Sequence, residues 1–276
     1  MIDDGVRLNP QEWEMYQSFR DNGFIVLEDA ISSEMSEDLT IELLHLVRAQ
    51  NCQEVQVPDI EELDQGSRVE LLLKCLYALE QKDHEYIRRI HDALRECPAL
   101  LRVISSRRIC ETVNVLLGQK HEKVLFPRPH SVRIDMPHDE AFVLKWHQEV
   151  HYAPKDANLV QLWAPAVNDI TLENGALRVL PGSHNGGIAK TIDFVPEFGH
   201  AQYTVVPEHI AKYDEKIVEM KRGDVLLFDK RLIHRSGLNS STTPRLTVIS
   251  FYISVNSPNF FENIKPPKKV QNPYAQ

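Results

Sequence analysis

The sequence is poor in cysteine: its 276 residues include only four, and no two of them form a CxxC pair. All four lie before residue 120 and far apart, at Cys52, Cys75, Cys97 and Cys110. This spacing argues against a zinc ribbon, and a chain of this length does not need a disulfide framework to fold. We therefore expect four reduced thiols.

Positive charge is also scarce, because 31 lysines and arginines stand against 40 aspartates and glutamates, for a net charge of −9. This balance argues against non-specific binding to nucleic acid or to acidic membranes. The sequence lacks any apolar run that approaches the roughly 18 residues of a membrane-spanning helix. Its first residues, MIDDGVRLNPQEW, lack the basic start and apolar core of a signal peptide. We expect a cytoplasmic protein, a monomer or homodimer, without a nucleic-acid or membrane partner.

The spacing of apolar residues along the sequence changes near residue 120. Before that point apolar residues recur at helical spacing. Asn9 can cap a helix that begins at Pro10 and stops near Gly23. A short strand is expected over residues 24–28 and a loop over 51–68. Further helices are expected over residues 33–50, 69–97 and 106–117, the last stopped by Gly118.

After residue 120 apolar residues alternate with polar ones, and turn residues follow at short intervals. Six segments have this pattern: residues 131–136, 158–165, 176–180, 216–220, 224–229 and 245–255. Many short strands of this kind are typical of a jelly roll or barrel. We expect one domain, mainly β with helical additions. It would comprise a helical part (1–120), a jelly-roll core (121–256) with a loop over its mouth (189–214), and a C-terminal tail (257–276).

The segment KWHQEVHYAP, residues 145–154, holds two possible metal ligands, His147 and Glu149. If residues 142–150 are extended, both side chains lie on one face, about 6.5–7 Å apart at the backbone, whereas a helix would separate them by about 200°. His234, at the end of an apolar hairpin, is the candidate third ligand. Two histidines and one carboxylate form the facial triad of a non-haem iron(II) oxygenase. Taken alone, a His-x-Glu pair is more often a hydrogen-bonded surface pair.

Arg245 opens the last strong strand, RLTVISF, eleven residues after His234. A planar guanidinium can hold a carboxylate through two parallel hydrogen bonds. Thr247 and Ser236 face the same way if their strands are regular. One cation and two hydroxyls suit the far carboxylate of a dicarboxylic acid such as 2-oxoglutarate. The alternatives are a structural ion pair for Arg245 and backbone hydrogen bonds for the hydroxyls.

These segments, taken together, resemble the phytanoyl-CoA dioxygenase family of Fe(II)/2-oxoglutarate oxygenases. The resemblance covers about residues 21–253 and is carried by DNGFIVLEDAIS, WHQEVHYAP, ENGALRVLPGSHNGG, KRGDVLLFDKRLIHRSGLNSS and PRLTVISFYI, in the family's order. It implies a double-stranded β-helix, a cupin-like jelly-roll barrel flanked by N-terminal helices. It also implies metal ligands at His147, Glu149 and His234, and cosubstrate contacts from Arg245, Ser236 and Trp163.

The chain departs from the family's usual pattern at Glu149, where an aspartate is the common ligand. Glutamate still supplies a carboxylate, which disfavours halogenation, because related halogenases replace this residue with a small one. The expected enzyme binds Fe(II), 2-oxoglutarate and O2. It hydroxylates or otherwise oxidises an unactivated C–H bond of a small or medium-sized metabolite, releasing succinate and CO2. Two alternatives stay open, a catalytically silent jelly roll that binds a ligand and a metal-dependent barrel enzyme that does not use 2-oxoglutarate.

Overall fold

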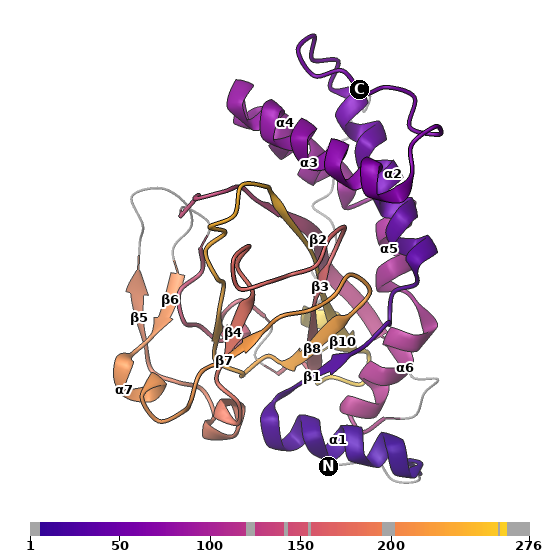
Figure 1. The fold of residues 1–276 in the computed structure, drawn as a ribbon. Coiled ribbons are helices and arrows are strands. Elements are labelled where there is room, and N and C mark those ends of the chain that lie inside the picture. The colour runs from indigo at the N-terminus through magenta and orange to yellow at the C-terminus, as the bar shows by residue number, and fades with distance from the viewer. Residues whose placement is uncertain are drawn as a thin grey trace, which may run out of the picture.

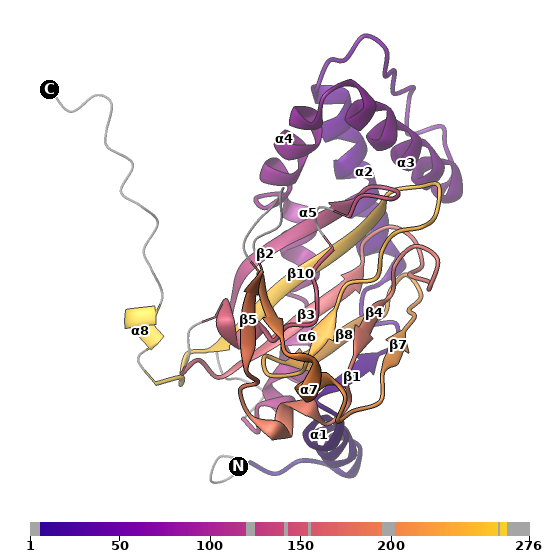
Figure 2. The ribbon, with the colours of Figure 1, turned by 90° about the vertical axis from the view of Figure 1, so that its left-hand side faces the viewer.

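The computed structural model describes residues 6–119, 125–140, 143–153, 156–194, 202–258 and 260–263. Six helices come first in the chain, and the strand β1 (Phe24–Leu27) lies between the first two. Figures 1 and 2 show these helices on one side and at both ends of the β region. The helices are α1 (Pro10–Asn22), α2 (Ser33–Ala49), α3 (Gln65–Lys82), α4 (His84–Leu94), α5 (Pro98–Ile104) and α6 (Arg107–Leu116).

The β region consists of antiparallel sheets. A five-stranded sheet has the order β1-β8-β3-β10-β2, and a three-stranded sheet has the order β7-β4-β9. A third sheet pairs β5 with β6. The remaining elements are β2 (Leu125–Asp135), β3 (Leu159–Pro165), β4 (Leu177–Val179), β5 (Thr191–Phe194), β6 (Gln202–Val205), α7 (Pro207–Ile210), β7 (Lys216–Val218), β8 (Val225–Asp229), β9 (His234–Arg235), β10 (Arg245–Ser254) and α8 (Phe260–Asn263). This is the jelly-roll architecture with helical additions that the alternating pattern predicts.

Alternation along the strands decides which face of the five-stranded sheet meets the helices. On β10, Leu246, Val248 and Tyr252 belong to one large core shared with α2 to α6. On β3 and β8, Trp163 and Phe228 point the other way, into a separate core shared with β4 and β7. The helices therefore cover the outer face of the sheet, and the interior lies between the two sheets.

Several predicted boundaries are confirmed. Asn9 caps α1, with a reciprocal hydrogen bond between Glu12 and the cap residue, and Gly23 ends that helix in a left-handed conformation (φ 83°). The short strand after it pairs with β8 as an edge of the five-stranded sheet. The described residues contain no helix that is both long and apolar enough to cross a membrane.

Three predictions are wrong in detail. Residues 69–97 are not one helix, because Asp83 ends α3 and its side chain caps α4. The insert 189–214 contains β5, β6 and α7, although residues 195–201 lie outside the described part. The predicted strand over 142–150 is not found in its described part, residues 143–150: His147 makes a single bridge, and Glu149–His151 is a 3-10 turn.

Candidate metal centre

The two histidines of the predicted triad lie directly opposite each other. His147 and His234 form an isolated antiparallel bridge, in which each backbone N–H donates to the other's carbonyl, at 2.9 and 3.0 Å. Side chains opposite each other in such a pair leave the same face. Their ring centroids are 4.2 Å apart, and both residues are 3% exposed. Residues 87 positions apart in the sequence thus present two imidazoles to one point.

Hydrogen bonds to the backbone set the tautomer of both rings. Nδ1 of His147 lies 2.7 Å from the carbonyl oxygen of Lys145, and Nδ1 of His234 lies 2.9 Å from that of Leu232. A carbonyl oxygen can only accept, so each Nδ1 carries a proton and each Nε2 is left to face the site. Burial lowers the pKa of His234, and the neighbouring His147 lowers it further. The Nε2 atoms are therefore ready to act as metal ligands.

Glu149 supplies the third possible ligand atom. Its Oε1 lies 3.3 Å from Nε2 of His147 and 3.5 Å from Nε2 of His234. Burial by itself raises the pKa of this carboxyl, but the interactions with the two imidazoles outweigh burial and hold the pKa well below its ordinary range. The carboxylate is ionised, as a metal ligand must be.

The three residues fit a single metal ion. Their ligand atoms all lie within 4.8 Å of one another, and all three residues are buried. Ligand atoms about 2.1 Å from one first-row ion and at right angles to each other are about 3 Å apart, so only small movements are needed. A buried carboxylate facing two Nε2 atoms is a donor set for a divalent transition metal.

Two glutamines support this arrangement. Gln148 is fully buried and points away from the triad, where its amide bonds the carbonyl oxygens of Gly187 and Arg231. Gln161, on β3, is 4% exposed, and its Nε2 lies 3.4 Å from Oε1 of Glu149. Sequence reasoning missed Gln161, although a lone polar residue in the apolar strand LVQLWAP was a usable signal.

A cavity of about 360 Å³ opens onto the triad. Ser236 and Trp163 line it. Its other walls combine apolar and polar side chains. It lies between the two sheets and reaches the end of α4. The complete lining is Arg95, Pro129, His130, Ser131, Arg133, Leu144, His147, Glu149, Gln161, Trp163, Leu177, Phe228, His234, Ser236, Ile249 and Phe251.

Arg245 lies behind this cavity and is not among the residues that line it. Its side chain is 2% exposed and pairs with Asp135, Nη2 to Oδ2 at 2.9 Å. Its Nη1 donates to the carbonyl oxygens of Gly175 and Gly237. Strand register explains the ion pair, because Arg245 and Asp135 face each other across β10 and β2.

Asp135 is shared by two guanidinium groups. Its Oδ1 accepts from Nε and Nη2 of Arg133, while its Oδ2 accepts from Arg245. Burial raises the pKa of Asp135, but the charges of the two arginines outweigh it, and the net effect lowers the pKa. Arg133 and Asp135 are two residues apart in SVRIDM and therefore lie on one face of the strand. The sequence analysis did not predict this ion pair.

Thr247 sits two residues from Arg245 on the same strand face. It is fully buried, and its Oγ1 has no hydrogen-bond partner among the described residues. A buried hydroxyl without a partner costs free energy of about 1–3 kcal/mol. The pairing of a guanidinium with an unsatisfied hydroxyl on one face fits a carboxylate ligand such as that of 2-oxoglutarate.

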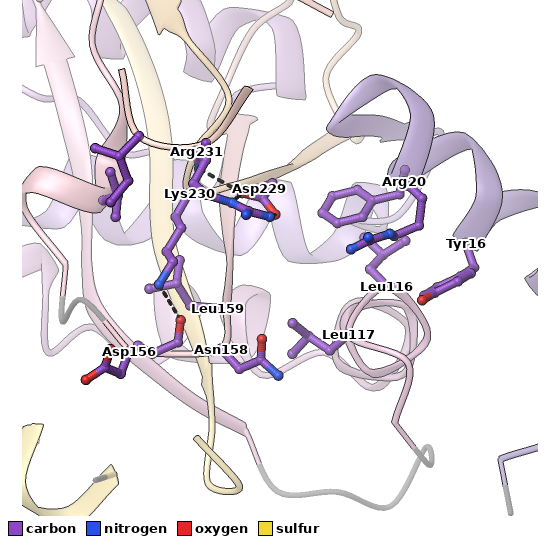
Figure 3. A pocket seen from close by; sticks show the side chains of 15 residues that line it. Tyr16, Arg20, Leu116, Leu117, Asp156, Asn158, Leu159, Asp229, Lys230 and Arg231 are labelled. Atoms are coloured by element: carbon purple, nitrogen blue, oxygen red, sulfur yellow. Dashed lines mark hydrogen bonds and ion pairs between the residues drawn. The ribbon is translucent and has the colours of Figure 1, made fainter. Parts of the chain in front are cut away.

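A second cavity, of about 430 Å³, lies away from the triad (Figure 3). It is bordered by α1, α6 and the turn after β8, and two of the cations that line it have partners. Arg231 pairs with Asp229, and Lys230 donates to the carbonyl oxygen of Ala157. None of the triad residues lines it. The cavity over His147, Glu149 and His234 is therefore the candidate active site.

Comparison with protein families gives one match over most of the chain. The family model of phytanoyl-CoA dioxygenase (PhyH) matches residues 19–247. The phytanoyl-CoA dioxygenase domain-containing protein 1 of Danio rerio is 25% identical over 267 residues, which cover 86% of this chain and 88% of that protein. The peroxisomal phytanoyl-CoA dioxygenase of Mus musculus is 25% identical over 238 residues, which cover 83% of this chain and 64% of that enzyme.

Solved structures show the same fold at low sequence identity. The epimerase SnoN in complex with Fe3+, alpha ketoglutarate and nogalamycin RO aligns with a TM-score of 0.61 and 15% identity, over 96% of this chain and 94% of that one. EctD from S. alaskensis, with 2-oxoglutarate and 5-hydroxyectoine, aligns with a TM-score of 0.61 and 17% identity, over 96% and 84%. At identities this low, the structural likeness shows the fold alone.

Proposed function

Because the chain belongs to the phytanoyl-CoA dioxygenase family, we propose that it hydroxylates or otherwise oxidises an unactivated C–H bond of a small or medium-sized metabolite. The general chemistry is that of an iron(II)- and 2-oxoglutarate-dependent dioxygenase, with O2 as the oxidant. The observation that carries the proposal is the convergence of His147, Glu149 and His234 on one point beneath a cavity.

We assign His147, Glu149 and His234 as the iron ligands. The carbonyl oxygens of Lys145 and Leu232 keep the Nδ1 protons in place, so both imidazoles offer Nε2. When bound, iron and 2-oxoglutarate together supply the reductive activation of O2, with succinate and CO2 as products. The protein's own contribution is to hold the ligands, orient the substrate and exclude water.

We assign Arg245, Thr247, Ser236 and Trp163 to the cosubstrate. The buried hydroxyl of Thr247 lacks a partner in the part of the chain that the structure describes, and a carboxylate oxygen would provide one. The guanidinium of Arg245 is held in place by Asp135 and by backbone carbonyl oxygens, so little side-chain entropy remains to be lost on binding.

The size of the cavity supports a small substrate. About 360 Å³ is at the low end of the roughly 300–1,000 Å³ that ligand sites occupy. Leu177, Phe228 and Ile249 give it an apolar wall that excludes water from the reacting centre. We further propose that residues 1–276 act as one domain, because a single core joins the helices to the five-stranded sheet.

The test is an anaerobic titration with Fe(II) and then 2-oxoglutarate. We expect a weak visible charge-transfer band, and slow succinate release once O2 is admitted without substrate. His234→Ala and Glu149→Gly should abolish the band. His45→Ala, which removes an exposed imidazole on α2, should leave it unchanged.

Each alternative function predicts a different result. A barrel enzyme that does not use 2-oxoglutarate would bind Fe(II) without developing the band. A silent ligand-binding jelly roll would release no succinate under O2. If Arg245→Gln leaves the affinity for 2-oxoglutarate unchanged, the assignment of the cosubstrate anchor is wrong, although the metal assignment stands.

A further inference from the structure

Gln161 places a side-chain amide on the wall of the candidate active site. It lies on β3, lines the cavity and is 4% exposed. One end of its amide lies 3.4 Å from Oε1 of Glu149. An ionised carboxylate only accepts hydrogen bonds, so this end is the NH2 group and the other end is the carbonyl oxygen. The proposed metal ligand therefore fixes the orientation of the amide.

The carbonyl oxygen of Gln161 is buried and has no hydrogen-bond partner among the described residues. Its neighbours across the sheet cannot supply one, because Gln161 lies opposite Phe228 on β8 and opposite Phe251 on β10. Both phenylalanines line the cavity, and neither side chain has a polar atom. Buried polar groups are ordinarily hydrogen-bonded, and an unsatisfied acceptor costs free energy. The cavity is the remaining side from which a donor can approach.

We propose that the carbonyl oxygen of Gln161 accepts a hydrogen bond from an O–H or N–H group of the substrate, and that this contact selects substrates with such a donor. This inference rests on the proposed function and adds the hydrogen-bonding class of the substrate to it. A site built to bond a donor discriminates strongly against analogues that lack the donor, because its own acceptor is then left unpaired.

The contact also determines where the donor lies relative to the metal. The oxygen and nitrogen atoms of one amide are about 2.2 Å apart, so the carbonyl oxygen of Gln161 lies less than about 6 Å from Oε1 of Glu149. The donor is therefore held close to the proposed iron ligands, within a few bonds of the carbon that is oxidised. Phe228 and Phe251, on either side of Gln161, offer apolar surface to the carbon skeleton of the substrate.

Two hydroxyl groups also line the cavity, those of Ser131 and Ser236. A hydroxyl can donate as well as accept, so it accommodates a donor and an acceptor alike. The carbonyl oxygen of an amide only accepts. A preference for donors is therefore the property that distinguishes Gln161 from the two serines.

The test measures binding to the Fe(II)–2-oxoglutarate complex without O2, with the visible band as the signal. The probes are pairs of nearly equal size, in which one member has a donor and the other has acceptors alone. Cyclopentanol and cyclopentanone form the O–H pair, and 2-pyrrolidinone and γ-butyrolactone form the N–H pair. The donor should bind about 5- to 150-fold more tightly than its partner, which is the effect of leaving one buried acceptor unsatisfied.

Gln161→Leu should make the two members of each pair bind equally, measured with enough Fe(II) to saturate the metal site. Gln161→Glu keeps an acceptor oxygen at this position and should keep the preference. Gln161→Met has nearly the length of glutamine and no strong acceptor, so it replaces Gln161→Leu if that variant folds poorly. Gln81→Leu removes an exposed glutamine on α3 and should leave the preference unchanged.

A preference in one pair alone supports the inference and identifies the donor as O–H or N–H. Two results would overturn it. One is equal binding within both pairs by the original protein, including no binding of any probe. The other is a preference that persists in Gln161→Leu, which would assign the donor contact to another residue. In both cases the band itself remains. Absence of the band in the original protein would instead refute the proposed function.

Discussion

Removing the carboxylate of Asp135, which Arg133 and Arg245 share, tests whether this buried cluster of charges stabilises the fold. In Asp135→Asn, the guanidiniums of Arg245 and Arg133, which are 2% and 20% exposed, lose their common counter-ion. Breaking a buried ion pair by removing one partner costs about 3–5 kcal/mol. The side-chain oxygen of an asparagine can accept from one arginine, but its NH2 group then faces the other arginine. We expect the free energy of unfolding to fall by about 3–5 kcal/mol.

Urea unfolding followed by circular dichroism measures this change, and the melting temperature should fall by roughly 10 °C. Asp38→Asn is the matched control, because it removes an exposed carboxylate that pairs with Arg102 at 2.8 Å. Exposed pairs contribute about 0–1 kcal/mol. If both variants unfold at the same urea concentration, the cluster does not stabilise the fold and the reasoning fails.

A double variant isolates the cause. In Arg133→Gln the carboxylate has one guanidinium left to balance, so a later Asp135→Asn takes the shared counter-ion from Arg245 alone and not from both arginines. The double variant should therefore be more stable than the sum of the single changes predicts, by about 0.5–3 kcal/mol. Strict additivity would show that the two arginines do not share Asp135 in solution.

The pH dependence follows from the same carboxylate. The folded pKa of Asp135 is lowered, so its contribution to stability is fully present above the ordinary value of 3.8. That contribution is lost as the pH falls below 3.8 and through the folded value. The original protein should lose more stability in this acid range than Asp135→Asn does, as measured by urea unfolding at a series of pH values.

Three further variants test separate parts of the structure. Gln161→Leu removes the amide beside Glu149 and should weaken Fe(II) binding about 10- to 100-fold, measured in competition with a chelating dye. Unchanged Fe(II) affinity would show that the amide does not orient the carboxylate. Gly175→Ala places a Cβ against Nη1 of Arg245 at a residue with φ 94°, so calorimetry should show weaker 2-oxoglutarate binding and a lower melting temperature. A protein unaffected in both would contradict the packing around that guanidinium. Asn9→Ala removes a helix cap and should cost about 1 kcal/mol in urea unfolding without altering metal affinity.

Local patterns in the sequence predicted the elements whose causes are local. The cap at Asn9 and the alternation along RLTVISFYISV depend on neighbouring residues, and both are confirmed. The break at Asp83 also had a local cause, since its side chain accepts from the backbone N–H of Glu85, yet apolar periodicity across it masked the stop. Among the described residues 143–150, His147 makes the single β-bridge, and the chain turns at Glu149.

The sequence by itself determined which donor atoms the site can offer: two imidazoles, a carboxylate, and a guanidinium two residues from a hydroxyl. Only the tertiary structure decided which of them meet. His147 and His234 face each other because their backbones exchange hydrogen bonds across 87 residues of chain. Arg245 pairs with Asp135, and Arg133 reaches the cavity, because of the register between β10 and β2. Strand register is set by long-range pairing and packing, which spacing along the chain does not encode.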